Sequence, residues 1–196
     1  MKFFHERVVP AAIAQYVVSA DPEAVLIAHG IGSCVVVALH DPEICIGGLL
    51  HAALPLSKAG GGLAPAKYVD AGFDVLLHTM IRAGVQKQRI VVQIAGGSNL
   101  LTAPGFANTL DIGRRNIAAA ELVIAREGLR IAAADVGGHG GRTVRLYVGS
   151  GKMTVQTLGQ DEKVLAASHA SANVVPLSAA LCVADHVPGP VGGILE

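Results

Sequence analysis

Short apolar runs separated by turn residues dominate the first part of the chain and predict β-strands. Residues 35–39 and 44–50 are apolar and rich in β-branched side chains, and Asp41, Pro42 and Glu43 between them are typical of a type I turn. We therefore predict that the two runs form an antiparallel hairpin. Because both faces of this hairpin are apolar, we expect a layer of structure to cover each side of it.

Two amphipathic helices are predicted further along the chain. Apolar residues recur at helical spacing over residues 69–82, and Gly84 follows as a stop signal. Asp111 as an N-cap and Gly128 as a C-terminal signal bound a second helix, over about residues 113–127. Further strands are predicted over residues 14–19, 24–28, 89–95, 129–134, 143–148 and 152–157.

The order of these elements, ββββ-α-β-α-βββ, indicates the fold class. Strands that do not alternate regularly with helices are typical of an α+β fold. We predict a layered α/β/β sandwich with mixed, largely antiparallel sheets and two main helices on one side.

The hairpin register brings one cysteine and one histidine together. A turn centred between Pro42 and Glu43 pairs residues whose numbers sum to 85, which places Cys34 directly opposite His51. An imidazole in reach of a thiol can take its proton, so the pair is typical of a cysteine nucleophile and its base. The alternative is that Cys34 is a small buried hydrophobe and His51 a core histidine with its hydrogen bonds satisfied.

Small residues precede the cysteine and indicate where a substrate would lie. Gly30, Gly32 and Ser33 allow the backbone to turn tightly and allow a substrate to approach main-chain N–H groups. We expect Gly32 and Ser33 to lie on the substrate side, with the N–H groups of Ser33 and Cys34 holding an oxyanion.

Composition excludes several classes of protein. Apolar residues make up 52% of the chain and charged residues 15%, and 15 basic residues balance 15 acidic ones, so nucleic-acid binding is not expected. Three cysteines without C-x-x-C spacing and eight scattered histidines indicate neither a metal site nor a cofactor, and they fit a cytoplasmic protein. Residues 164–184 carry no charge, but several polar side chains argue against membrane insertion. We expect one domain over residues 1–163 and an extension over residues 164–196 that docks on the domain or on a partner.

Several motifs occur along the chain in a fixed order. GSC at residues 32–34 is followed by H-A-A-L-P at 51–55, QIAGGS at 93–98, IGRRN at 112–116 and DVGGHGGR at 135–142. In this order they resemble the motifs of the chemoreceptor glutamine deamidase family, CheD. The resemblance spans roughly residues 14–160.

The resemblance implies a function and a set of catalytic residues. Cys34 would be the nucleophile and His51 its base in a cysteine-dependent glutaminase that acts on the cytoplasmic domains of chemoreceptors without a cofactor. A CheC-type phosphatase of the response regulator would be a second partner, and the alternative function is a catalytically weak adaptor that binds receptors and such a phosphatase.

The chain departs from the family at one catalytic position. The family has a threonine six residues before the cysteine, where this chain has Ala28. We therefore expect the residue that orients His51 either to be missing or to be replaced by another residue, such as Ser33 or His29. Arg115 and Asn116 near the start of the second helix are expected either to contact an anion or to brace the glycine loops.

Overall fold

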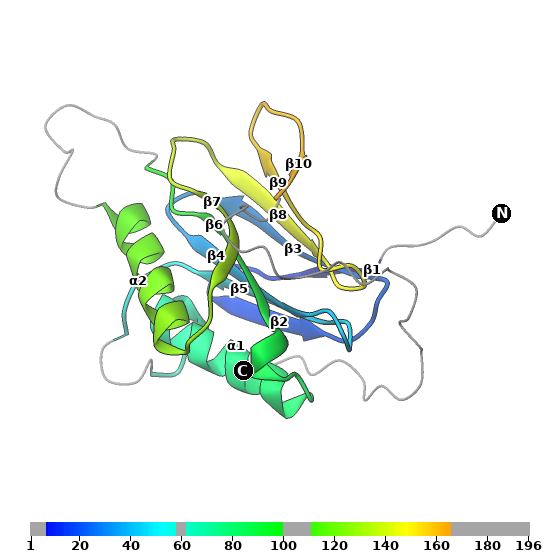
Figure 1. Ribbon diagram of the computed structural model, residues 1–196. Coiled ribbons are helices and arrows are strands. Elements are labelled where there is room, and N and C mark those ends of the chain that lie inside the picture. Colours follow the sequence, from blue (N-terminus) through cyan, green and yellow to red (C-terminus); the bar gives the residue numbers. More distant parts are fainter. Residues whose placement is uncertain (1–6, 58–61, 100–110, 166–196) are drawn as a thin grey trace, which may run out of the picture.

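Two mixed sheets and two α-helices form three layers in the computed structural model, which describes residues 7–57, 62–99 and 111–165 (Figure 1). The central sheet has the order β2 (Gln15–Ser19), β5 (Ile46–Ala52), β4 (Val35–Asp41), β6 (Val91–Gly96) and β7 (Ile131–Val136). The outer sheet has the order β1 (Arg7–Pro10), β3 (Ala24–Ile31), β8 (Arg142–Tyr147), β9 (Met153–Thr157) and β10 (Lys163–Val164). The helices α1 (Val69–Arg82) and α2 (Ile112–Arg126) lie on the side of the central sheet that faces away from the outer sheet, and the short 3-10 turns are η1 (Pro65–Lys67) and η2 (Lys87–Arg89).

The central hairpin β4–β5 is buried on both faces, as predicted. Along β4, Val35 and Val37 pack with the helices, whereas Val36 and Ala38 pack against the outer sheet. This alternation follows from the period of two in a strand, which sends successive side chains to opposite faces. The α/β/β sandwich with helices on one side is therefore confirmed.

The register of the hairpin differs from the prediction. Val36, not Cys34, lies opposite His51, and paired residues sum to 87 rather than 85. The reason is a longer turn: Asp41 pairs with Ile46, and Cys45 has a left-handed backbone with φ of 50° that closes the connection. A shift of two residues preserves the face of every side chain, so Cys34 and His51 still belong to the same face.

Two strands at the edges of the outer sheet were not predicted. β1 pairs in parallel with β3, and β10 pairs with β9 over only two residues. β6 and β7 form the other parallel pair, and the remaining ladders are antiparallel. The predicted extension lies outside the described residues from position 166 onward.

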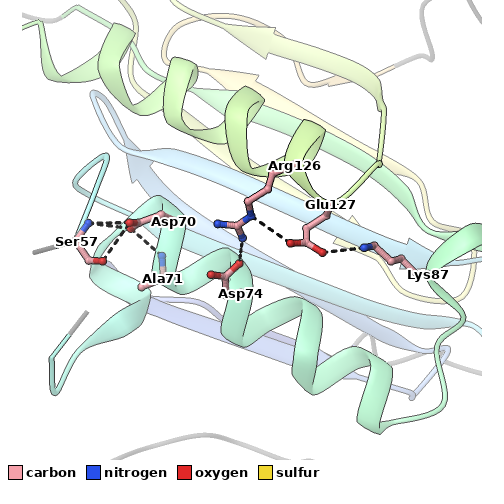
Figure 2. Close-up of polar contacts among 7 residues, drawn as sticks. All are labelled: Ser57, Asp70, Ala71, Asp74, Lys87, Arg126 and Glu127. Carbon is pink, nitrogen blue, oxygen red and sulfur yellow. Dashed lines mark hydrogen bonds and ion pairs between the residues drawn. The ribbon is translucent and has the colours of Figure 1, made fainter. Parts of the chain in front are cut away.

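Ion pairs and hydrogen bonds fix the two helices to each other and to the neighbouring loops. Figure 2 shows Arg126 of α2 between Asp74 of α1 and Glu127, and Glu127 also binds Lys87 with an N–O distance of 2.8 Å. At the start of α1, Asp70 accepts hydrogen bonds from the backbone N–H and the hydroxyl of Ser57. The Arg126–Asp74 ion pair ties the C-terminal end of α2 to α1, and the Ser57 hydrogen bonds tie the start of α1 to the preceding loop.

The far end of the hairpin depends on Asp41, which is completely buried. Its carboxylate accepts from Arg89 Nη2 at 2.6 Å and from the backbone N–H groups of Glu43 and Gln86. Burial raises the pKa of Asp41, but the Arg89 guanidinium and these N–H groups outweigh it and hold the pKa below its ordinary value.

We expect Asp41→Ala to lower the free energy of unfolding by about 3 kcal/mol, because it leaves Arg89 without its buried partner. A depressed pKa stabilises the fold above the ordinary carboxyl pKa, and this stabilisation is lost as pH falls through the folded pKa. Urea denaturation at pH 7 and at acidic pH measures both effects. Glu43→Ala, which removes an exposed partner of the same guanidinium, serves as the control and should cost less than about 1 kcal/mol. Equal losses in the two variants would contradict the assignment.

Candidate active site

His51 lies on the buried face of β5 that meets the outer sheet, with only 1% of its surface exposed. Its Nδ1 lies 3.2 Å from the carbonyl oxygen of Ala11. A carbonyl can only accept, so Nδ1 carries the proton and donates it, which leaves Nε2 as the acceptor nitrogen of a neutral ring. Nε2 is buried and has no hydrogen-bond partner among the residues that the structure describes.

The backbone of Ala11 is itself fixed by the outer sheet. Ala11 lies between β1 and β2, where the chain passes from the outer to the central sheet, and its N–H donates to the carbonyl of Ile27 at 2.7 Å. Its carbonyl is thereby held toward His51. The residue that orients the imidazole is therefore Ala11, through its main chain.

The two residues predicted to orient His51 do not contact its Nδ1. His29 pairs its Nδ1 with the Thr143 hydroxyl at 3.4 Å on an exposed surface, and the Ser33 carbonyl accepts from Asn116. Ala28, at the position of the family threonine, is completely buried in the apolar cluster between the sheets. The role of Ala11 could not be predicted from the sequence, because every residue has a main-chain carbonyl and the type of side chain does not indicate which one binds His51.

Cys34 lies directly before β4 and is a free, half-buried thiol. Its side chain has the same parity as Val36, so it belongs to the same face as His51 and lies diagonally from it across the hairpin. Such diagonal neighbours are about 7–8 Å apart. No hydrogen bond between the two side chains occurs in the described structure, so the pair shares a face but is not joined at rest.

Burial shifts both groups toward their neutral forms. It raises the pKa of the Cys34 thiol, and the residue's own backbone N–H offsets this only in part. It lowers the pKa of His51, although the hydrogen bond to the Ala11 carbonyl acts in the opposite direction. At neutral pH the pair therefore rests as a thiol and a neutral imidazole, and not as a preformed thiolate and imidazolium.

The glycine-rich motifs at residues 93–98 and 135–142 support the main chain of residues 32–34. The Cys34 carbonyl accepts from the Gly97 N–H at 2.7 Å, and the Gly32 carbonyl accepts from the Ser98 N–H at 2.8 Å. The Ser98 hydroxyl receives a hydrogen bond from the buried guanidinium of Arg142. Arg142 also binds Asp135 and the carbonyls of Gly137 and Gly140. Segments far apart in the sequence thus hold one short stretch of backbone.

The predicted substrate-side residues lie in this stretch. The carbonyl groups of Gly32, Ser33 and Cys34 all accept hydrogen bonds from the groups behind them. In the described ranges, neither the Ser33 N–H nor the Cys34 N–H donates to another residue's main chain. The Cys34 N–H interacts instead with the sulfur of its own side chain.

The described residues contain neither a cluster of metal-ligating side chains nor a membrane-spanning helix. Among residues 7–57, 62–99 and 111–165, no group of three or more His, Cys, Asp or Glu side chains is placed to hold a metal ion. Neither described helix combines the length and the apolar run that are needed to cross a bilayer.

Comparison with known proteins places the chain in a family. The family model described as CheD chemotactic sensory transduction matches residues 53–157, which is more than half of the chain. The chain belongs to the CheD family. The matched segment begins after His51, so it contains the glycine loops and α2 but neither Cys34 nor His51.

Curated relatives of CheD type cover more of the chain. The probable chemoreceptor glutamine deamidase CheD of Symbiobacterium thermophilum is 37% identical over 81% of this chain and 98% of its own length. The relative from Anaeromyxobacter dehalogenans is 39% identical over 76% of this chain and 94% of its own length. The relative from Thermococcus kodakarensis is 35% identical over 80% of this chain and 96% of its own length. A Bacillus licheniformis protein of solved structure, YfiH, matches at a TM-score of 0.41 and 11% identity over 69% of this chain and 60% of its own, which is too low to bear on the fold or function.

The geometry of this CheD chain predicts how Cys34 reacts with iodoacetamide. His51→Gln should slow alkylation of Cys34 at neutral pH about tenfold, because an amide cannot take the thiol proton when the Cys34 side chain turns toward residue 51 during the reaction. The pH at which the wild-type alkylation rate reaches half of its maximum should lie above the ordinary thiol pKa of about 8.5, because burial raises the pKa of Cys34. Mass spectrometry of the Cys34 peptide follows the rate.

His40→Gln is the matched control for this measurement. His40 is buried on the same face of β4 at the other end of the hairpin, and its Nε2 lies 2.7 Å from the Val148 carbonyl. Its replacement should leave the alkylation rate unchanged. If both glutamine variants alter the rate equally, Cys34 and His51 do not form a pair.

Proposed function

We propose that this chain is a chemoreceptor glutamine deamidase that hydrolyses glutamine side chains in the cytoplasmic domains of receptors to glutamate, with Cys34 as nucleophile and His51 as base. The observation that carries the proposal is the buried Nε2 of His51, which has no partner among the described residues and lies on the same face as a free thiol. The Ala11 carbonyl fixes the tautomer in which this nitrogen accepts a proton. The family and the names of the curated relatives support the substrate class.

The reaction begins with two neutral groups. Cys34 Sγ attacks the carbon of the substrate carboxamide while His51 Nε2 takes the thiol proton, so charge develops only when substrate is present. The N–H groups of Ser33 and Cys34 bind the oxyanion of the tetrahedral intermediate. The intermediate collapses to a thioester as the imidazolium donates its proton to the leaving nitrogen, which departs as ammonia.

Water completes the cycle. His51 Nε2 takes a proton from a water molecule, and the resulting hydroxide attacks the thioester carbon. The carbon–sulfur bond breaks, the imidazolium returns its proton to Cys34, and the receptor side chain is now a glutamate. The site residues supply every proton transfer, and the mechanism needs no metal or organic cofactor.

Cys34→Ser and His51→Gln should each lower the rate of deamidation at least about a thousandfold while leaving the melting temperature within a few degrees. The double variant should be little worse than either single one, because both residues serve the same step. Purified receptor cytoplasmic fragments are incubated with each variant, ammonia is measured, and mass spectrometry locates the glutamine-to-glutamate changes. His40→Gln is again the control and should keep full activity.

An undiminished rate in Cys34→Ser would contradict this mechanism. Receptor binding without ammonia release by the wild type would favour the alternative function, an adaptor that also binds a CheC-type phosphatase. The same fragments serve for both measurements.

The pH dependence follows from the shift at His51. The base must be neutral, and burial lowers its pKa, so the acid limb of kcat/KM should have a midpoint below the ordinary imidazole value of about 6.5. Activity is therefore retained at pH values where an exposed histidine would already be protonated. A midpoint above about 6.5 would show that an imidazolium, or another group, controls the reaction.

A further inference from the structure

Asn116 joins the two segments that carry the reacting side chains. It lies in α2 and is completely buried. Its Nδ2 donates to the Ser33 carbonyl at 2.8 Å and to the Ala53 carbonyl at 3.1 Å. Ser33 directly precedes Cys34, and Ala53 follows His51 by two residues. Since both neighbours are carbonyl oxygens, only the NH₂ end of the amide can occupy this position.

The first turn of α2 is itself fixed against the backbone of the site. A Cβ at Gly113 would lie 2.5 Å from the Gly97 carbonyl oxygen, and a Cβ at Gly97 would lie 2.5 Å from the side chain of Ile117. Gly97 donates in turn to the Cys34 carbonyl. The start of α2 therefore reaches Cys34 by two routes, through Gly97 and through Asn116. Asn116 also reaches Ala53, which directly follows β5, the strand of His51.

Stability alone does not explain this residue. The Oδ1 of Asn116 is buried and has no hydrogen-bond partner within the described ranges, and an unpaired buried acceptor destabilises the fold. Replacement by alanine removes two donated hydrogen bonds and also this unpaired oxygen. Removal of the unpaired oxygen therefore offsets part of the stability that is lost with the two hydrogen bonds. The link between the ends of the two strand segments, in contrast, is lost completely.

We propose that Asn116 is a positioning residue that sets the distance between Cys34 and His51 by binding the backbone beside each of them. The proposal rests on the assignment of Cys34 and His51 as the reacting pair. Asn116 touches neither reacting atom. It acts through the carbonyl groups of Ser33 and Ala53.

The test is a double-mutant cycle read by alkylation of Cys34, which requires no receptor substrate. Asn116→Ala removes the link, and Asn116→Asp keeps the shape but replaces the donor with oxygens that face two carbonyls. Ile124→Ala is the control, because Ile124 is buried in the same helix, within the core away from the site. Each is combined with His51→Gln, and rate constants at neutral pH are compared.

If Asn116 positions the pair, His51→Gln slows alkylation about tenfold in the wild type and in Ile124→Ala, but less than about twofold in both Asn116 variants. Thermal melts show whether Ile124→Ala is destabilised at least as much as the two Asn116 variants. An equal effect of His51→Gln in every background would overturn the proposal, and so would no effect in the wild type.

Deamidation kinetics separate this proposal from the proposed function. Both Asn116 variants should lower kcat about tenfold or more with KM changed less than about twofold, because positioning acts on the reaction and not on substrate binding. Should the wild type deamidate no receptor fragment, the proposed function fails, while the alkylation cycle still decides the role of Asn116. A rise in KM with kcat unchanged would contradict positioning.

Discussion

Burial of the β4–β5 hairpin on both faces is the constraint from which the site follows. A strand covered on one side only would leave its alternate residues in water, whereas here each residue of β4 and β5 is buried. One face packs on α1 and α2, and the other packs on β3 and β8. His51 belongs to the second face, so its environment is the dry space between two sheets. The low polarity of that space is what keeps the imidazole neutral.

The chain segment next to the outer sheet holds His51 through a main-chain group rather than through a side chain. β1 pairs with β3, and the chain then crosses to the central sheet at Ala11. The crossing carries one main-chain carbonyl to His51 Nδ1. At the position where the resemblance to the family implies a threonine, the chain has Ala28, which lies in β3. A main-chain acceptor orients an imidazole as firmly as a hydroxyl does, because the sheet holds its position. The absence of a hydroxyl at Ala28 therefore leaves the tautomer of His51 defined.

Local patterns in the sequence predicted the layers but not the details that depend on contacts distant in sequence. Alternation in β4 and β5 and helical spacing in α1 and α2 gave the elements and their buried faces correctly. The hairpin register was wrong by two residues because Cys45 adopts a left-handed conformation that its residue type does not favour. The edge strand β1 and the role of Ala11 were missed, since both depend on the pairing of a short N-terminal segment with β3. Arg115 and Asn116 were expected either to contact an anion or to brace the glycine loops, and the structure shows Asn116 bound to the carbonyls of Ser33 and Ala53.

The neutral resting state of Cys34 bears on how the protein tolerates oxidants. Peroxides attack the thiolate and react slowly with a protonated thiol. Many nucleophilic cysteines are held as thiolates by an adjacent cation and are oxidised readily for that reason. Here burial raises the pKa of the Cys34 thiol and lowers the pKa of the imidazole on the same face. The burial of Cys34 therefore favours the protonated thiol, which is the form that oxidants attack slowly.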